Sequence, residues 1–433
     1  MTGSFGRTLL KRAVLCTLAV VLIAGCSQTL RQIAIALPSQ TGDPAPLNRA
    51  LFLATAGASS PGTVTMVDVP GDTNVGVETV GLDPVMIGLT LGGGRAVVPN
   101  SASNTASSFQ TGVAFGTVST TTLPAGSGAS FVASRQNGKF YIALSALDEL
   151  GVVDFTLSVT KEVPLTGCSI PVALSQVPGG GNIYVACSGG NVAVVSPSDN
   201  VLLTTITDAG SPQWIDSSSD GKYMFVANQG TGQVDVICST TDVTVCAGNT
   251  VIANTTVAGA PNFVKYDTHT QHVLVAGAGF VSVLDASGIA PTFADIKDLP
   301  ASGQTWITAL ADGSRIYVSD AGAQSVTSYN ATNYGLLKTI SLKDATHPIS
   351  APLNTTPIMI DSDKNSTKVY TANTGSNDFT IINTLTDTEV FPGPVVSGQP
   401  TRLSPPAIPG CTVIPPALPS TCNQVPKWVA VLP

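Results

Sequence analysis

Few side chains in this 433-residue sequence are of the types that carry out acid–base, nucleophilic or metal chemistry. The chain has three histidines, His269, His272 and His347, and none occupies a repeated position or lies near a cysteine in sequence. A C-x-x-C motif, a haem-attachment C-x-x-C-H motif and the G-x-S-x-G elbow of many serine hydrolases are absent. The sequence therefore predicts no catalytic constellation, although a Ser–His–Asp site assembled from distant segments stays open.

One segment has the oxygen pattern of a cation loop. Asp361, Asp363 and Asn365 place carboxylate and amide oxygens at alternate positions, as calcium loops do. The following glycine and the distal glutamate of a full loop are missing, so an Asx-rich turn is the main interpretation and calcium the alternative. No other metal and no cofactor is predicted.

Six of the eight cysteines fall into three pairs that are close in sequence. Six cysteines allow fifteen pairings in principle, but short loops favour neighbours. We therefore expect disulfides between the members of each local pair, which are Cys168 and Cys187, Cys238 and Cys246, and Cys411 and Cys422. Such bridges indicate an oxidising compartment outside the cytoplasm.

The amino-terminal residues have the features of an export signal. Arg7, Lys11 and Arg12 precede an apolar run over residues 13–25, which is too short to span a bilayer as a helix. Its end, Leu-Ile-Ala-Gly followed by Cys26, resembles the lipobox of bacterial lipoproteins, in which that cysteine is acylated. This resemblance implies a protein anchored to a membrane of the bacterial envelope through Cys26. Ser27 favours the outer membrane where the host has two membranes.

The charge balance excludes one class of partner. The formal net charge is −8, and loss of the three basic residues of the signal peptide makes it −11. Only 11% of residues are charged. Binding to phosphate backbones needs clustered Lys and Arg, so nucleic acid is not an expected partner.

Repetition dominates the remainder of the chain. Segments at 137–143, 180–186, 220–228 and 312–320 each join a polar turn to a strand rich in β-branched and aromatic residues, and a second strand follows. One equivalent strand position recurs every 41 to 53 residues, at Leu53, Val98, Ile142, Val185, Val226, Val275, Val318 and Thr371. Several short strands within about 45 residues are typical of a β-propeller blade. The sequence predicts an all-β propeller of about eight four-stranded blades, with seven blades plus an extra hairpin as the alternative.

The amino-acid sequences of these strands resemble a known repeat family. Phe225-Val226-Ala227-Asn228, Tyr370-Thr371-Ala372-Asn373 and Tyr317-Val318-Ser319-Asp320 are similar to YVTN-type repeats. These repeats occur in archaeal surface-layer proteins, in periplasmic YncE-like proteins and, more distantly, in lactonase-like propellers. The resemblance covers roughly residues 50–405. It implies the propeller architecture and says little about activity.

A further column of residues marks the start of the inner strand of each blade. It follows a bend that usually contains proline, and it comprises Met86, Phe131, Ala173, Trp214, Phe263, Trp306, Met359 and Arg402. The last member lies in residues 399–404, which we expect to form the inner strand that completes the first blade and closes the ring. The column is predicted to surround the mouth of the central channel, where an apolar funnel with one cation would bind a hydrophobic or anionic ligand. Packing between blades is the competing interpretation.

These observations divide the chain into four parts. They are a signal peptide over 1–25, a tether over 26–48, the propeller over 49–405 and a Pro-rich, disulfide-stapled extension over 406–433. The predicted function is a lipid-anchored envelope module that binds a protein or small ligand at the channel mouth. A lactonase-like hydrolase with its site at the same mouth is the alternative, because fold alone does not determine activity.

Overall fold

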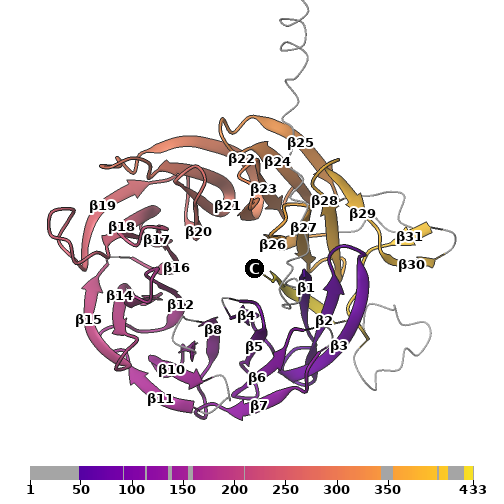
Figure 1. Cartoon of the computed structure of the whole chain (residues 1–433), viewed down its shortest axis with the longest axis horizontal. Helices are drawn as coiled ribbons and strands as arrows, with labels where there is room; N and C mark the ends of the chain where they lie inside the picture. Colours follow the sequence, from indigo (N-terminus) through magenta and orange to yellow (C-terminus); the bar gives the residue numbers. More distant parts are fainter. Residues whose placement is uncertain are drawn as a thin grey trace, which may run out of the picture. The chain divides into compact units, whose positions relative to one another are not determined.

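A computed structural model describes residues 48–90, 92–112, 115–134, 139–154, 159–208, 210–342, 355–396, 399–407 and 424–432. Within these ranges the chain forms strands and turns without a helix, so no described helix is long and apolar enough to cross a membrane. The strands make eight antiparallel four-stranded blades arranged in a ring (Figure 1). The predicted eight-bladed β-propeller is confirmed, and the seven-blade alternative is wrong.

Each blade runs outward from an inner strand that lines the channel. Blade 1 contains β32 (Val425–Val431), β1 (Arg49–Thr55), β2 (Pro61–Asp68) and β3 (Thr73–Leu82). Blade 2 contains β4 (Gly88–Leu89), β5 (Arg95–Asn100), β6 (Thr105–Gln110) and β7 (Ser119–Thr122). Blade 3 contains β8 (Ala129–Ser134), β9 (Lys139–Leu144), β10 (Glu149–Asp154) and β11 (Val159–Pro164). Blade 4 contains β12 (Pro171–Gln176), β13 (Ile183–Cys187), β14 (Asn191–Ser196) and β15 (Val201–Thr207).

Blades 6 and 7 are joined in one continuous sheet, because they share the long strand β22, and the long strand β21 supplies two strand segments of blade 6. Blade 5 contains β16 (Pro212–Ser217), β17 (Tyr223–Asn228), β18 (Gln233–Cys238) and β19 (Thr250–Thr256). Blade 6 contains β20 (Pro261–Asp267), both halves of β21 (His272–Asp285) and the first half of β22 (Asp295–Ala309). Blade 7 contains the second half of β22, then β23 (Arg315–Asp320), β24 (Ser325–Asn330) and β25 (Leu336–Ser341). Blade 8 contains β26 (Pro357–Ser362), β27 (Lys368–Asn373), β28 (Asp378–Asn383) and β29 (Thr388–Val390).

The ring is closed by the carboxyl-terminal strand β32. Its residues pair antiparallel with β1, for example Val429 with Phe52. A C-terminal inner strand was predicted, but its location at residues 399–404 is wrong. Residues Gln399–Thr401 form β31, which pairs with β30 (Gly393–Val396) in a separate two-stranded sheet. The assignment of 406–433 to an extension outside the propeller is therefore also wrong for Val425–Val431.

The turns between strands lie on two opposite faces of the ring, which we call the front face and the back face according to the direction of the inner strands. Inner strands begin at the front face and end at the back face, and neighbouring strands in a blade are antiparallel. Turns between the first and second strands and between the third and fourth strands therefore lie on the back face. The core of each blade comprises its second and third strands, such as β17, whose six residues are all buried.

The Asn that ends the repeated motif is a buried structural residue. The Nδ2 atom of Asn228 donates to Asp208 Oδ1 and to Asp235 Oδ2, at 2.5 and 2.7 Å. Asn373 donates in the same way to Asp378 Oδ1 and Thr380 Oγ1, at 2.7 and 2.8 Å. Each side-chain amide thus donates hydrogen bonds to polar side chains near a turn, which the backbone hydrogen bonds of the sheet do not reach.

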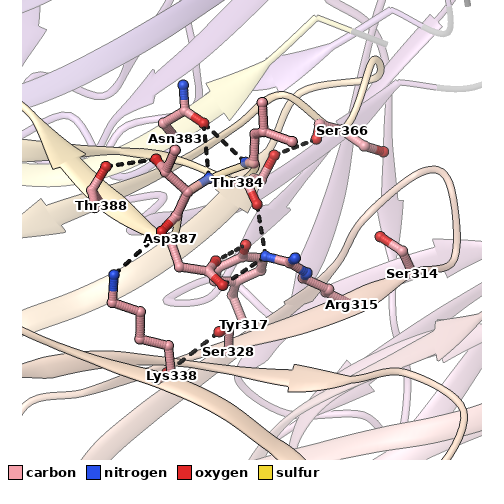
Figure 2. Close-up of polar contacts among 12 residues, drawn as sticks. Ser314, Arg315, Tyr317, Ser328, Lys338, Ser366, Asn383, Thr384, Asp387 and Thr388 are labelled. Atoms are coloured by element: carbon pink, nitrogen blue, oxygen red, sulfur yellow. Dashed lines mark hydrogen bonds and ion pairs between the residues drawn. The ribbon is translucent and has the colours of Figure 1, made fainter. Parts of the chain in front are cut away.

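Neighbouring blades are joined by a recurring contact on the back face. In blade 8, Asp387 has a φ of 50°, and its carboxylate accepts from Tyr317 Oη and Arg315 Nη1 of blade 7, at 2.5 and 2.6 Å (Figure 2). At the closing seam, Lys368 Nζ of blade 8 lies 2.5 Å from Asp72 Oδ2 of blade 1. A basic residue at the start of the second strand thus binds an Asp in the left-handed turn of the next blade. We call each such contact a blade latch.

The same turn position is used in two more blades with neutral partners. Tyr141 Oη donates to Asn200 Oδ1 and Tyr184 Oη to Asn249 Oδ1, at 2.9 and 2.6 Å. Burial raises the pKa of Tyr184 to about 12, which keeps its hydroxyl protonated as the donor.

Two of the three predicted disulfides are present. Cys168 is bonded to Cys187, and Cys238 to Cys246. The third predicted bridge, between Cys411 and Cys422, lies outside the described residues, as does the acylation site Cys26.

Candidate functional site

A β-bulge recurs near the start of six of the eight inner strands and aims one side chain of each of them into the channel. The register shifts between Pro212 and Trp214, between Pro261 and Phe263, and between Pro171 and Ala173. Equivalent shifts occur in β8, β26 and β32. Proline lacks the N–H that a ladder needs, and a bulge locally re-aims the strand. This repeated irregularity accounts for five members of the predicted column, Phe131, Ala173, Trp214, Phe263 and Met359.

The three tryptophans of the chain meet in the channel. The ring of Trp214 lies 5.3 Å from that of Trp306 and 6.2 Å from that of Trp428, measured between centroids. Phe263 stacks on Trp306 at 4.3 Å, and Phe131 contacts Trp214 edge-on at 5.1 Å. Blades 3, 5 and 7 are not neighbours in the ring, so these contacts must cross the channel. They form a layer of aromatic rings that we call the aromatic layer.

Arg402 was predicted as the eighth member of the inner-strand column at the channel mouth, and that prediction is wrong. Its side chain is buried and forms ion pairs with Glu389, on the outer strand β29, and with Asp378. Trp428 of β32 takes the eighth position instead. The prediction failed because the sequence of residues 399–404 resembles the proline-containing start of an inner strand, but these residues do not pair as an inner strand of a blade.

A pocket of about 300 Å³ opens beside the aromatic layer, toward the back face. It includes the three tryptophans, Phe263 and Met359, and, one inward-facing position further along their strands, Asp216, Lys265 and Asp361. Met86 and Phe131 pack within the buried cluster of blades 2 to 5 and do not line the pocket. The structure therefore brings four of the predicted ligand-binding residues to the pocket, namely Trp214, Phe263, Trp306 and Met359.

Charged groups form the polar side of this pocket. Lys265 Nζ donates to Thr308 Oγ1 at 3.3 Å. Asp216 Oδ2 accepts from the backbone N–H of Tyr266 at 2.9 Å, and Asp361 Oδ2 from that of Val431 at 3.1 Å. Burial raises the pKa of the Asp361 carboxyl, while the charge of Lys265 acts in the opposite direction. The pocket therefore offers one ammonium donor and two carboxyl groups beside indole rings.

The side chains of residues 361–365, the segment considered as a calcium loop, lie in two different places. Asp361 faces the pocket, whereas Asp363 accepts from the backbone N–H groups of Thr367 and Lys368, each at 2.6 Å. Asn365 donates its own N–H to Asp363 Oδ2 at 3.2 Å. These bonds make an Asx-type turn. Within the described ranges no group of three or more His, Cys, Asp or Glu side chains is placed to hold a metal ion.

Asp216, Lys265 and Trp428 line the pocket although the sequence pattern did not predict them as site residues. The first two lie two residues after the predicted column, and alternation along a strand places such residues on the same side. The sequence contained this alternation. The alternation selects the same position in every blade, including blades with a small residue there, so it did not indicate which of these positions line the pocket. The described histidines lie elsewhere, since His272 Nδ1 contacts Tyr334 Oη at 2.5 Å on the back face.

Comparison with known proteins shows the fold alone. No family model matches the chain, and no curated protein matches it. Among solved structures, the periplasmic gluconolactonase of Pseudomonas aeruginosa is 13% identical, with a TM-score of 0.55 over 89% of this chain and 99% of that one. The dihydro-heme d1 dehydrogenase NirN is 11% identical, with a TM-score of 0.64 over 91% and 77% of the two chains. A functionally unknown protein from Desulfotomaculum acetoxidans is 14% identical, with a TM-score of 0.55 over 67% and 95%. These neighbours share the β-propeller architecture.

Proposed function

We propose that this protein is a lipid-anchored module of the bacterial envelope that binds a small amphiphilic ligand in its central channel. The observation that carries the binding role is the pocket in which all three tryptophans of the chain lie beside Lys265 and Asp361. Aromatic walls with a few convergent polar groups are the usual composition of small-molecule sites. A volume of about 300 Å³ is at the small end of their range.

The ligand that suits these walls has an apolar face and a polar edge. The indoles of Trp214, Trp306 and Trp428 offer large apolar surfaces. Lys265 and Asp361 would bind the polar edge through charge-assisted hydrogen bonds, which are stronger than neutral ones. The cation expected at the mouth is thus supplied by Lys265, in place of Arg402.

Tryptophan fluorescence tests the binding role with little background, because every tryptophan of the chain lines the pocket. We would titrate the protein with a panel of amino acids, monosaccharides, aldonolactones and aromatic carboxylates. A saturable change with one class is expected, and it should be lost in Lys265→Met and retained in Asp312→Asn, a change at an exposed turn. The absence of saturable binding by any class, checked by calorimetry, would contradict the binding role.

The anchoring part of the proposal is supported by the amino-terminal sequence. Arg7, Lys11 and Arg12 precede the apolar run that ends at Cys26. Acyl chains on that cysteine would fix the propeller to the membrane, since each buried CH₂ contributes roughly 0.8 kcal/mol. Cys26→Ser should abolish incorporation of radiolabelled fatty acid and release the protein from the membrane fraction. Unchanged fractionation of this variant would contradict the anchor.

A hydrolase acting on lactones is the second candidate. It is favoured by two carboxyl groups in one pocket, of which Asp361 has a raised pKa as a general acid would. Hydrolysis of glucono-δ-lactone, followed by base consumption at constant pH, tests it. Activity that is lost in Asp361→Asn would favour the hydrolase, whereas saturable binding without turnover would favour the binding module.

A further inference from the structure

The most exposed large apolar side chains of the described residues lie on one face. They are Val243, Ile289, Leu336 and Leu385, with 83%, 98%, 63% and 68% of their surfaces exposed. No other large apolar side chain in the described ranges exceeds 51%. Single exposed apolar side chains are common on protein surfaces, whereas a group of them at equivalent places on one face indicates a contact surface.

The fold places these four residues at one structural position. Each lies in, or at the end of, the turn between the third and fourth strands of its blade, in blades 5, 6, 7 and 8 in succession. Those turns are all on the back face, at the outer side of the ring (Figure 1). We call this set, Val243, Ile289, Leu336 and Leu385, the aliphatic arc.

The first described residue lies on the same face of the propeller. The described chain begins at Asn48, immediately before β1, and β1 starts on the back face. Asn48 Nδ2 donates to Asp363 Oδ2, at 3.2 Å, in the first turn of blade 8. Blade 8 carries Leu385, one end of the aliphatic arc. Asn48 lies only 22 positions after Cys26, and a fully extended chain of this length spans at most roughly 75 Å.

We propose that the back face docks on the bilayer to which the protein is anchored, with the aliphatic arc inserted among the lipid head groups. This proposal rests on the lipid anchor of the proposed function. Insertion of exposed aliphatic side chains into the interfacial region is favourable in proportion to the apolar area removed from water. The body carries a net charge of −11 without its signal peptide, so attraction to anionic lipid does not drive the contact. Docking should therefore occur on zwitterionic lipid and persist at high salt.

The test uses the acylated full-length protein in phosphatidylcholine vesicles. An environment-sensitive fluorophore is attached at Ile289→Cys, and in a matched variant at Leu147→Cys, which lies in a turn on the front face. Lipids with nitroxide groups near the head group should quench the probe at position 289 and leave that at 147 unquenched, with equal results at low and high salt. Equal quenching at both positions, or none at either, would overturn the docking.

A second variant separates the aliphatic arc from the anchor. Replacing Val243, Leu336 and Leu385 by Ser in the labelled protein should reduce the quenching at 289 by roughly tenfold or more. Folding is checked by circular dichroism, because these side chains are exposed. Retained quenching would overturn the proposal, as would concentration-dependent dimerisation that is abolished by the same changes, which would assign the arc to a second copy.

Failure of the anchor has a different signature. If fatty-acid labelling shows that Cys26 is not acylated, the anchoring proposal fails. The mature chain would then be tethered to nickel-chelating lipid through a histidine tag placed before Ser27. Selective quenching at position 289 in that form would still support docking, and its absence would exclude it.

Discussion

The indole of Trp428 stacks on that of Trp214 across the channel, with centroids 6.2 Å apart and ring planes at 20°. Trp428 belongs to β32, the strand that closes the ring against β1. The same strand, β32, therefore closes the ring and completes the aromatic layer. A protein that fails to pair β32 loses one wall of the pocket together with the integrity of the ring.

Removal of β32 should be severe although it deletes only the last residues of the chain. A protein ending at Gln424 would leave β1 as an unpaired edge of blade 1, and such edges template aggregation. We expect this truncated chain to be insoluble or rapidly degraded by protease. Recovery of soluble protein and limited proteolysis provide the measurement.

The control for this truncation is Gln399→Pro in β31. That change disrupts only the two-stranded sheet of β30 and β31, so solubility and protease resistance should stay close to those of the parent. A soluble, protease-resistant chain ending at Gln424 would contradict the assignment of closure to β32.

The blade latch between blades 7 and 8 should contribute measurably to stability. Arg315→Met leaves the largely buried carboxylate of Asp387 without its cationic partner, and we expect a loss of about 2 kcal/mol in the free energy of unfolding. Tyr317→Phe removes one hydrogen bond to the same carboxylate and should cost about 1 kcal/mol. Urea unfolding monitored by circular dichroism measures both.

A double-mutant cycle with Asp387→Ala tests whether these contacts are coupled. In that background Arg315→Met and Tyr317→Phe should cost little, because their shared partner is gone. Lys338→Met is the exposed control, since Lys338 Nζ donates to the Thr386 carbonyl, at 3.2 Å, in the exposed part of that turn. Fully additive losses would show that the latch is not a unit.

The buried carboxyl pair Asp208 and Asp235 should make stability fall as pH rises. Burial and the adjacent Asp235 raise the pKa of Asp208 from 3.8 to about 8, while the Asn228 amide acts in the opposite direction. Between about pH 4 and pH 8 the folded state thus holds a proton that the unfolded chain has released. The free energy of unfolding should decrease over this range by up to about 1.4 kcal/mol per pH unit.

Asp208→Asn removes this titration and should flatten the profile. The variant is expected to gain stability over the parent at pH 8 and to approach it near pH 4, in urea titrations at a series of pH values. Asp312→Asn at an exposed turn serves as the control and should leave the parent slope unchanged. Parallel profiles for the parent and Asp208→Asn would show that Asp208 ionises normally in the folded protein.

The architecture was accessible from sequence because each blade repeats a local pattern. Turn residues and β-branched strands recur at nearly constant spacing, and the inner-strand column places Trp214, Phe263 and Trp306 correctly. The closing strand was not accessible in this way. Residues 399–404 and 425–431 both have strand-like sequences, and the choice depends on which pairs with β1, which is distant in sequence.

The site shows the same division between local and non-local information. The aromatic layer follows from one position in the repeat. The pocket depends on which blades have a charged residue two positions after the column residue of the inner strand. Asp216, Lys265 and Asp361 are such residues, while Gly88, Ala133 and Ser175 hold the equivalent places in blades 2 to 4. Whether such residues line an open space depends on side-chain volumes across the whole ring.

The disulfides allow a prediction about the part of the chain beyond the described residues. Six cysteines follow Cys26, and four of them are paired with near neighbours, Cys168 with Cys187 and Cys238 with Cys246. Within one mature chain this leaves Cys411 and Cys422 as partners for each other. A non-reduced tryptic digest should yield a disulfide-bearing peptide that contains both residues, and the denatured protein should contain no free thiol other than that of any unacylated Cys26.

The two bridges in the propeller should differ in what their removal does. Loop-closure entropy assigns about 3 kcal/mol to the bridge spanning 19 residues and about 2.5 kcal/mol to that spanning 8. Cys168 and Cys187 are also fully buried, so their replacement by Ala leaves a cavity, whereas Cys246 lies in a partly exposed loop. We therefore expect the first Ala pair to lower the melting temperature more than the second. Equal shifts in scanning calorimetry would indicate that the unfolded chain, and not packing around Cys168 and Cys187, determines both losses.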